Sequence, residues 1–285
     1  MKAKRSHAVI LVNTLKNDAE SLSREIALEL GGDGWLTSII TVGKKRGNDS
    51  ALATADILLS LGGDGTVLYA ARAAAPFGIP ILPINLGTLG FIAWVKRSEW
   101  RARFDEAVSG SLAVSERFML DVSVCRGDHS IAAFCALNDG VVSGAGPAKI
   151  VNLSISVHGV ALGRYRSDGL IVATPTGSTA YSLAAGGPVL DPDMDAMVFT
   201  PICPFTLSNR PLVLPGGESL ELRVEPGQRE ATMLTVDGQE FFDLQEGDLV
   251  QIRRSAFKAR LFRPDRGSFF HVLRSKLNWS GGPDA

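Results

Sequence analysis

The sequence has few cysteines and almost no net charge, and both absences exclude classes of protein. Its three cysteines, Cys125, Cys135 and Cys203, lie far apart, and none belongs to a Cys-x-x-Cys pair. They predict reduced thiols in a cytoplasm and argue against a disulfide framework or a zinc site. The 29 Lys and Arg residues balance 30 Asp and Glu residues, for a formal charge of −1. A neutral surface attracts neither phosphate backbones nor anionic lipids, so no nucleic-acid or membrane partner is expected.

Long apolar runs and two common nucleotide motifs are also missing. No stretch reaches the ~20 apolar residues that a membrane-spanning helix needs. The basic N-terminus leads into an apolar run at 8–12, but Asn13 ends that run and no small-residue cleavage site follows. A buried first strand is therefore favoured over a signal peptide. The sequence lacks Gly-x-x-x-x-Gly-Lys-Ser/Thr, and no Gly-x-Gly-x-x-Gly follows a strand pattern. This disfavours an ordinary P-loop kinase and a Rossmann dehydrogenase.

The first part of the chain alternates between strand patterns and helical patterns. In the first helical pattern Leu22, Ile26 and Leu30 recur every four residues, with Asp18 as the expected N-cap and Gly31 as the expected left-handed end. Strands that alternate with helices predict a parallel sheet wrapped by helices. The predicted strands span 8–12, 36–42, 57–61 and 79–84, and two further helices are predicted at 66–75 and 98–110.

From about Phe118 onward the pattern becomes strict alternation, which is typical of strands buried on one face. Alternating stretches lie at 149–157, 220–224, 249–252 and 259–262, separated by turn residues such as Asp237-Gly238. They predict a β-rich, β-sandwich-like second domain. The predicted division is an α/β domain with a parallel sheet at 1–112, a β-rich domain at 113–262 and a C-terminal tail at 263–285. Whether the tail returns to the first domain is left open.

The most informative segment is Gly62-Gly63-Asp64-Gly65-Thr66, which joins a predicted strand directly to a predicted helix. Glycines there let backbone amides approach an anion, and the helix N-terminus adds positive potential. An aspartate in such a loop would repel phosphate, so its presence indicates a role in orienting Mg²⁺ or in accepting a proton from an attacking hydroxyl. A tight strand-to-helix turn without a ligand is the alternative interpretation.

Two further segments have both a structural and a functional interpretation. Residues 85–91, Asn-Leu-Gly-Thr-Leu-Gly-Phe, follow the next strand, where open α/β sheets bind ligands. This segment could present Phe91 to an adenine, or it could be a glycine loop with Phe91 in the core. The pair Asn138-Asp139, followed by Gly140, has the composition of a hairpin turn. The same amide and carboxylate could instead hold ribose hydroxyls and an adenine edge.

The densest polar patch starts at Arg166 and ends at Pro188. It contains Asp168, a predicted strand at 170–173, and the run Thr-Pro-Thr-Gly-Ser-Thr-Ala-Tyr-Ser-Leu-Ala-Ala-Gly-Gly-Pro at 174–188. Small hydroxyl residues and glycines bring backbone donors and hydroxyls close to a polar ligand. The patch also offers a tyrosine ring for stacking and a carboxylate for a ribose or a carboxamide. A loop without a ligand has little need for so many small polar residues.

Together these four segments resemble the NAD kinase family, and the resemblance runs in order from roughly Val9 to Phe262. The glycine-aspartate loop alone also resembles that of diacylglycerol and sphingosine-type lipid kinases and, more loosely, that of 6-phosphofructokinases. Residues 86–91, the Asn138-Asp139 pair and above all residues 174–188 narrow the resemblance to NAD kinases.

The resemblance implies an enzyme that moves a phosphoryl group from ATP to the adenosine-side 2′-hydroxyl of NAD, giving NADP. Asp64 would be the general base, and Gly62, Gly63, Gly65 and Thr66 would form the phosphate loop. Family members use ATP with Mg²⁺, which binds through the ATP phosphates, and usually form homodimers or homotetramers. The nucleotide-binding residues would be Asp64, Gly65, Asn138, Asp139, Lys149, Arg166, Asp168, Thr179, Ala180, Tyr181, Ser182, Leu183, Ala184 and Gln239.

Three positions depart from the family pattern, and two other functions stay open at this point. Asp139 replaces the commoner glutamate, Ala184 stands where many members have serine, and Phe205 occupies a place associated with histidine. One alternative is a lipid kinase of the diacylglycerol type, which should have an apolar acceptor cleft. The other is a non-catalytic sensor that binds NAD, against which the presence of Asp64 argues.

Overall fold

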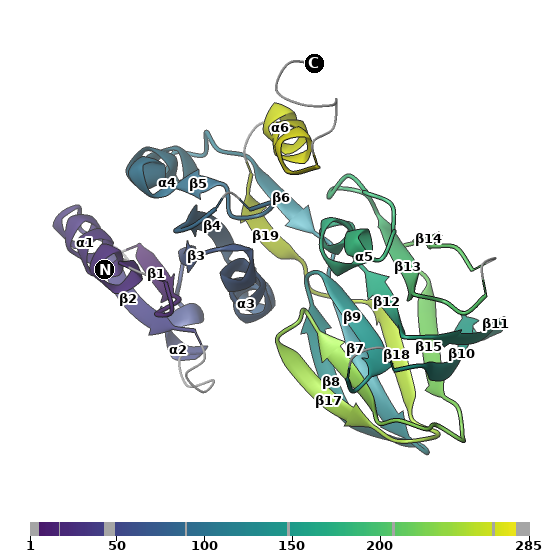
Figure 1. The fold of residues 1–285 in the computed structure, drawn as a ribbon. Coiled ribbons are helices and arrows are strands. Elements are labelled where there is room, and N and C mark those ends of the chain that lie inside the picture. Colours follow the sequence, from purple (N-terminus) through teal and green to yellow (C-terminus); the bar gives the residue numbers. More distant parts are fainter. Residues whose placement is uncertain are drawn as a thin grey trace. The chain divides into compact units, whose positions relative to one another are not determined.

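The structure is a computed structural model that describes residues 6–16, 18–42, 49–88, 90–146, 149–206, 209–263 and 266–277. The chain divides into two compact units (Figure 1). Unit 1 comprises Met1–Glu116 and Ala259–Ala285, and unit 2 comprises Arg117–Lys258. The C-terminal segment therefore does return to the N-terminal unit.

Unit 1 is an α/β unit built on a mostly parallel sheet, here called sheet 1. Its strand order is β2-β1-β3-β4-β19-β6, and β5 pairs with β4. Every residue of β1 and β3 is buried, as expected for strands that are covered on both faces. The predicted parallel sheet is thus confirmed. Its strands are β1 (His7–Val12), β2 (Leu36–Thr41), β3 (Ile57–Gly62), β4 (Pro80–Asn85), β5 (Val95–Lys96), β6 (Val114–Arg117) and β19 (Ala259–Phe262).

Helices cover both faces of sheet 1. Leu22, Ile26 and Leu30 of the first helix and Phe104 of the fourth join the strands in one core. The third helix packs against β3, β4 and β19 on the other side of the sheet (Figure 1). The helices are α1 (Ala19–Gly32), α2 (Asp49–Leu52), α3 (Asp64–Ala74), α4 (Trp100–Val108) and α6 (Arg266–Leu277), with 3₁₀ turns η1 (Ala75–Phe77) and η2 (Arg97–Glu99).

The ends of α1 differ from those expected. Asp18 has a φ of 60° and makes no side-chain capping bond; its carboxylate instead lies 3.3 Å from the guanidinium of Arg97. Gly31 is inside the helix, because the backbone hydrogen bonds continue as far as the amide of Asp33. Gly34, with a φ of 88°, is the left-handed residue that follows. Asp18 occupies the predicted N-cap position, but its side chain makes no capping bond. The prediction that Gly31 is the left-handed end was wrong, and the helix itself was correctly placed.

Unit 2 contains two six-stranded antiparallel sheets. Sheet 2 has the order β11-β10-β15-β18-β7-β8, and sheet 3 has the order β14-β13-β12-β9-β16-β17. Side chains from both, such as Val122 and Leu153 of sheet 2 and Val142 and Phe199 of sheet 3, form one core. This is the predicted sandwich. The elements are β7 (Leu120–Arg126), β8 (His129–Ala136), β9 (Asp139–Gly144), β10 (Val151–Val157), β11 (Val160–Ser167), β12 (Gly169–Ala173), β13 (Ala196–Ile202), β14 (Leu212–Pro215), β15 (Ser219–Val224), β16 (Thr232–Val236), β17 (Glu240–Leu244), β18 (Leu249–Arg254), η3 (Gly177–Thr179) and α5 (Tyr181–Ala184).

One predicted strand lies in a different sheet from the one expected. The alternating stretch 259–262 forms β19, which pairs in parallel with β4 of sheet 1 through Arg260 and Leu261. Alternation reports that a segment is a strand, but it does not report which sheet receives that strand. Among the described residues, no helix is long and apolar enough to cross a membrane.

The burial of β3 gives a prediction for stability. Leu59→Ala removes a side chain with no exposed surface from the core of unit 1, and such substitutions typically cost about 2–5 kcal/mol of unfolding free energy. Leu28→Ala in α1 is the matched control, because Leu28 is 81% exposed and should change stability by no more than about 0.5 kcal/mol. Denaturant unfolding of the two variants measures both effects, and equal losses would contradict this packing.

Candidate functional site

The polar segments of unit 1 meet at the carboxyl ends of parallel strands. Strand β1 has β2 on one side and β3 on the other, so the order reverses between β1 and β3, and such switch points bind ligands in open α/β sheets. Asn13 follows β1, and Asp64 follows β3 after the glycine pair. The next loop, after β4, carries Gly87 and Gly90.

The carboxylate of Asp64 is held by the loop that follows β4. Its Oδ2 accepts a hydrogen bond from the amide of Phe91 at 2.8 Å, and its Oδ1 accepts two, from Ile92 at 3.1 Å and from Ala93 at 2.8 Å. A Cβ at Gly90 would overlap this carboxylate, so glycine is required for the close approach. The two glycine segments singled out in the sequence therefore form one site around Asp64.

Thr66 and Gly62 have a packing role within this loop. The Thr66 side chain is buried, and its hydroxyl accepts a hydrogen bond from the side-chain amide of Asn13 at 3.2 Å. A Cβ at Gly62 would overlap that hydroxyl. Gly65 is exposed at the start of α3. The exposed Lys16 brings its ammonium 3.9 Å from the position of a Cβ at Gly87, and sequence reasoning did not single out this cation.

In unit 2 the Asn138-Asp139 pair is a crossover between sheets. Strand β8 ends at Ala136 in sheet 2, and β9 begins at Asp139 in sheet 3. The interpretation as a hairpin turn is therefore wrong, because a hairpin would join neighbouring strands of one sheet. The composition of the pair was compatible with both structures, and only the partners of β8 and β9 distinguish them.

The backbone of this crossover is hydrogen-bonded from two sides. The Thr174 hydroxyl donates to the Leu137 carbonyl at 2.6 Å, and the Thr174 amide donates to the Asn138 carbonyl at 2.8 Å. From the other side the Asp237 carboxylate accepts hydrogen bonds from the amides of Leu137 at 3.1 Å, Asn138 at 2.7 Å and Asp139 at 3.3 Å. Sequence reasoning had assigned Asp237 only to a turn.

Two side-chain oxygens beside the crossover have no partner in the described residues. The Oδ1 of Asn138 and the Oγ1 of Thr176 are both buried without a hydrogen bond. The two segments are in contact, because a Cβ at Gly177 would overlap the Asn138 backbone. Buried polar atoms are nearly always paired, so these two oxygens mark a place where a polar ligand can bind. Thr176 was part of the polar run noted in the sequence but was not named as a site residue.

Asp139 is a buried acid beside a second one. Burial, and then the charge of Asp237, raise the pKa of the Asp139 carboxyl to about 7. Asp139 is 4% exposed and lies at the same end of sheet 3 as the two unpaired oxygens. An acid with a pKa near neutrality can both donate and accept hydrogen bonds, which suits the recognition of hydroxyl groups.

The remaining predicted residues of unit 2 lie near the two ends of β12 or beside its middle. Ala173 lies opposite Asp139, whereas Gly169 lies opposite Ser143, so Asp168 is at the other end of the strand. Four residue steps separate these two ends, or about 14 Å at ~3.4 Å per residue. Between them, Ser182 of α5 hydrogen-bonds through its buried hydroxyl to Thr200, which pairs with Ile171 in the middle of β12.

The basic residues gather at the Asp168 end. The guanidinium of Arg166 stacks on the exposed ring of Phe205, 5.0 Å from its centroid. The ammonium of Lys149 forms an ion pair with Glu230 at 2.7 Å. Gln239 is exposed two residues after Asp237, at the Asp139 end. The segment Thr179, Ala180, Tyr181, Ser182, Leu183 and Ala184 forms the end of η3 and α5, with the Tyr181 ring partly exposed.

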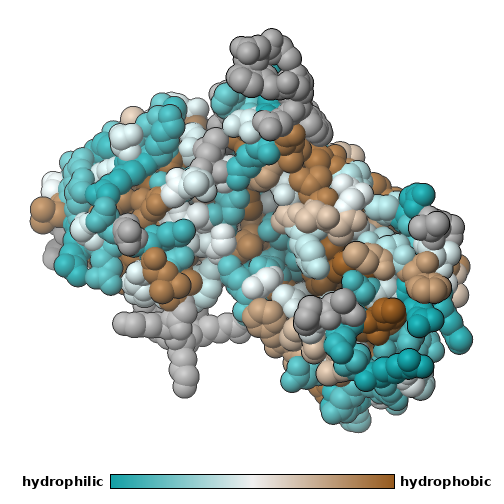
Figure 2. All heavy atoms as spheres, in the orientation of Figure 1, coloured by the Kyte–Doolittle hydropathy of each residue, from teal (hydrophilic) through white to brown (hydrophobic). Residues whose placement is uncertain are grey.

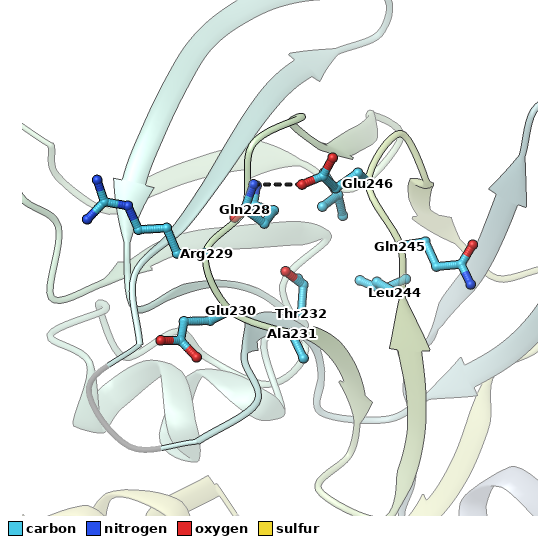
Figure 3. Close-up of a pocket in the computed structure, with 9 residues that line it drawn as sticks. Gln228, Arg229, Glu230, Ala231, Thr232, Leu244, Gln245 and Glu246 are labelled. Atoms are coloured by element: carbon cyan, nitrogen blue, oxygen red, sulfur yellow. Dashed lines mark hydrogen bonds between the residues drawn. The ribbon is translucent and has the colours of Figure 1, made fainter.

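A pocket at the far end of β16 contains none of the predicted site residues (Figure 3). In it the backbone amide of Gln228 donates to the Glu246 carboxylate at 2.8 Å. The side chain of Arg229 extends away from Thr232 (Figure 3). Within the described residues, the buried Oγ1 of Thr232 has no hydrogen-bond partner. Thr232 alternates in phase with Leu234 and Val236, which belong to the core between sheets 2 and 3. The pocket is lined by Val224, Gln228, Arg229, Glu230, Ala231, Thr232, Leu244, Gln245 and Glu246.

Comparison with known proteins bears on both units. The family model of the ATP-NAD kinase N-terminal domain matches residues 16–111, and that of the ATP-NAD kinase C-terminal domain matches residues 137–263. The NAD kinase of Treponema denticola is 48% identical over 217 residues, which cover 76% of each chain. The NAD kinase of Treponema pallidum (strain Nichols) is 41% identical over 273 residues, covering 96% of this chain and 90% of its own.

Solved structures share the fold. An NADH kinase from yeast, complexed with NADH, superposes with a TM-score of 0.87 at 24% identity, over 98% of this chain and 89% of its own. An NAD kinase from Archaeoglobus fulgidus, in complex with ATP, gives a TM-score of 0.75 at 26% identity, over 95% and 98%. Neither the lipid kinase nor the non-catalytic sensor gains support from these relatives. The chain belongs to the NAD kinase family.

Proposed function

We propose that the chain transfers a phosphoryl group from ATP to the adenosine-side 2′-hydroxyl of NAD, giving NADP and ADP. The observation that best supports this function is the layout of unit 2. Hydrogen-bonding groups stand at both ends of β12, and the small residues of α5 lie between them. A ligand with two nucleoside halves suits such an elongated arrangement better than a compact polar metabolite or a lipid tail.

The Asp139 end has the chemistry to bind the adenosine half. The unpaired oxygen of Asn138 can accept a hydrogen bond from an exocyclic amine, and the hydroxyl of Thr176 can both donate and accept. The buried Asp139, at the same end of β12, can hold ribose hydroxyls through its carboxyl. The nicotinamide half of NAD is then bound by Asp168, Arg166 and Lys149. Tyr181 offers a ring for stacking. Gln239 is assigned to the Asp139 end.

Asp64 is proposed as the general base. A carboxylate has about four lone-pair sites, and three are occupied by the amides of Phe91, Ile92 and Ala93. One site is left, on Oδ2, which receives a single amide. That site can accept the proton of the 2′-hydroxyl of NAD. As the proton leaves, the hydroxyl oxygen attacks the terminal phosphorus of ATP, and ADP departs with the electron pair of the broken P–O bond. Because the three amides fix the carboxylate, it can act without first being oriented.

Mg²⁺ is proposed as the divalent metal, bound mainly through the phosphates of ATP. The described residues contain no group of three His, Cys, Asp or Glu side chains able to hold a metal alone. That composition fits Mg²⁺, which keeps several waters and needs only one or two carboxylates beside substrate phosphates. When bound, Mg²⁺ neutralises charge on the transferring phosphoryl group. Asp64 is the carboxylate that we propose to contribute to Mg²⁺ binding. The exposed Lys16, whose ammonium lies close to Gly87, can assist with phosphate binding.

We also propose a cytoplasmic enzyme that forms homodimers or homotetramers. Cys125, Cys135 and Cys203 form no disulfide, as expected in a reducing compartment. The edge strand β11 exposes Val160, the edge strand β14 exposes Val213, and apolar side chains on sheet edges favour pairing with another copy. Figure 2 shows hydrophobic residues interspersed with hydrophilic ones on the surface of unit 2.

The first test is turnover itself. Purified protein with Mg-ATP and NAD should produce NADP, measured with an NADP-specific dehydrogenase, and NAD should raise the melting temperature because it binds only the folded state. Diacylglycerol in mixed micelles is the matched acceptor control and should neither react nor stabilise. Absence of both NADP and a thermal shift at millimolar NAD would remove the proposed function.

The second prediction concerns Asp64. Asp64→Asn keeps the shape but removes the base, so turnover should fall by at least about 10²-fold, since general-base assistance is commonly worth ~10²–10⁴. The Kd of NAD should change much less. If Asp64 mainly holds Mg²⁺, raising the metal concentration should restore part of the activity. Steady-state kinetics at several Mg²⁺ concentrations distinguishes these roles, and a fully active variant would contradict both.

The third prediction uses the two buried hydroxyls without partners. Thr176→Val should stabilise the free protein slightly, because it removes an unpaired polar group, and should weaken NAD binding roughly tenfold, because a ligand hydrogen bond is lost. Thr232→Val is the matched control: it should stabilise the protein in the same way and leave NAD binding unchanged. Melting curves and calorimetric titrations measure both quantities. Equal NAD affinity in the two variants would remove Thr176 from the site.

A further inference from the structure

The turn between β16 and β17 carries a buried carboxylate that the mechanism above does not use. We infer that Asp237 is a positioning residue for nucleotide binding: it fixes the crossover at 137–139 so that the side chains of Asn138 and Asp139 are presented to the nucleotide. The inference rests on the proposed function, because it assigns to Asp237 the geometry of the adenosine end of that site.

The hydrogen bonds leave no freedom in the crossover backbone. Asp237 accepts from three consecutive amides, and its own amide donates to the Asp139 carbonyl at 2.9 Å. Thr174 satisfies the carbonyls of Leu137 and Asn138. All six backbone polar groups of these three residues are therefore used within the protein. The side chains of Asn138 and Asp139 take no part in this network, so the network orients them without occupying them.

The conformation of the turn explains why a carboxylate can reach this place. Asp237 has a φ of 52° and Gly238 a φ of 65°, and aspartate is one of the few residues that tolerate the left-handed region. Strand β16 pairs with β9, and Val236 lies opposite Gly140. This pairing brings the turn under the crossover. Asp237 is 7% exposed, whereas a residue at the tip of a hairpin is ordinarily solvated.

A second turn has the same pair of left-handed conformations without this role. His158-Gly159 joins β10 to β11 with φ values of 50° and 77°. The side chain of His158 is 77% exposed, and its imidazole lies 3.5 Å from the Glu218 carboxylate. The left-handed conformation alone therefore requires neither burial nor an acid. The burial and the carboxylate of Asp237 are therefore explained by its hydrogen bonds to the crossover.

Asp237 also acts on Asp139 through its charge. Burial and the Asp237 charge together raise the pKa of Asp139 to about 7. Around Asp139, the paired strand β12 contributes apolar residues at 170–173, and the segment 174–179 contributes hydroxyls, a proline and a glycine. Among the described residues, Asp237 is thus the charged group that influences this carboxyl. Removing its charge should therefore lower the pKa of Asp139.

Two substitutions separate the hydrogen bonds from the charge. Asp237→Gly keeps the left-handed turn and deletes both acceptor oxygens, and with them all three hydrogen bonds. The Kd of NAD should therefore rise at least about tenfold, because unpaired buried amides are costly. Asp237→Asn keeps the acceptor oxygen used by Asn138 and Asp139 but removes the charge. His158→Gly is the matched control for a glycine at a left-handed turn position, and it should bind NAD like the unaltered protein.

The measurement is the Kd of NAD by calorimetry at several pH values between 5 and 8, with circular dichroism to verify folding. In the unaltered protein, affinity should increase as pH rises through about 7, because an ionised Asp139 accepts stronger hydrogen bonds. In Asp237→Asn the midpoint should move to lower pH. If Asp237→Gly does not fold, this midpoint still decides the question.

The outcomes distinguish the inference from the proposed function. An unaltered protein that neither binds nor phosphorylates NAD overturns the proposed function, and the inference with it. Tight binding by the unaltered protein, together with an unshifted midpoint in Asp237→Asn, overturns the inference alone. Unchanged affinity in a folded Asp237→Gly protein does the same.

Discussion

Two carboxylates, one in each unit, each accept hydrogen bonds from three consecutive backbone amides, which tie the carboxylate to a loop that leaves a sheet. Asp64 binds the amides of residues 91–93 in unit 1, and Asp237 binds those of residues 137–139 in unit 2. A chain that leaves a sheet loses the ladder that satisfied its amides, and a buried amide without a partner is destabilising. In both units one acid supplies the missing acceptors.

The hydrogen bonds of Asp64 and those of Asp237 serve opposite purposes. In unit 1 the loop holds the acid, so that Asp64 is fixed with one acceptor site open. In unit 2 the acid holds the loop, and the side chains on that loop stay unpaired. The buried oxygens of Asn138 and Thr176 are a cost to the free protein, and a ligand that pairs with them removes this cost. In the proposed function, recognition of the nucleotide depends on polar groups that the fold itself does not satisfy.

The sequence was sufficient for the elements and the chemistry but not for several connections. The buried strands at 8–12 and 57–61 were predictable, because a short continuous apolar run that stops at a polar residue or a glycine is typical of a strand covered on both faces. The glycine-aspartate loop was recognisable because an acid among glycines at the start of a helix needs a reason. The hairpin-like composition of Asn138-Asp139 was misleading, since left-handed tolerance is equally useful at a crossover.

Two residues of the proposed site carried no signal of their own in the sequence. Asp237 sits in an ordinary Asp-Gly turn, and its importance comes from backbone amides almost a hundred positions earlier in the chain. Thr176 is one hydroxyl residue among several, and only the absence of a partner for its buried oxygen distinguishes it. Patterns along the chain report local structure, whereas these two roles depend on which distant segments the sheets bring together.

The position of β19 has a consequence for biosynthesis. This strand lies between β4 and β6 in sheet 1, yet it is made after the whole of unit 2. When only residues 1–116 have been synthesised, sheet 1 therefore lacks the strand that lies between β4 and the edge strand β6. Unit 2, whose strands are contiguous in the chain, can reach its final pairing first. The part of the protein that emerges earliest is thus completed last, and a nascent chain arrested before residue 259 would expose the apolar edge of β4.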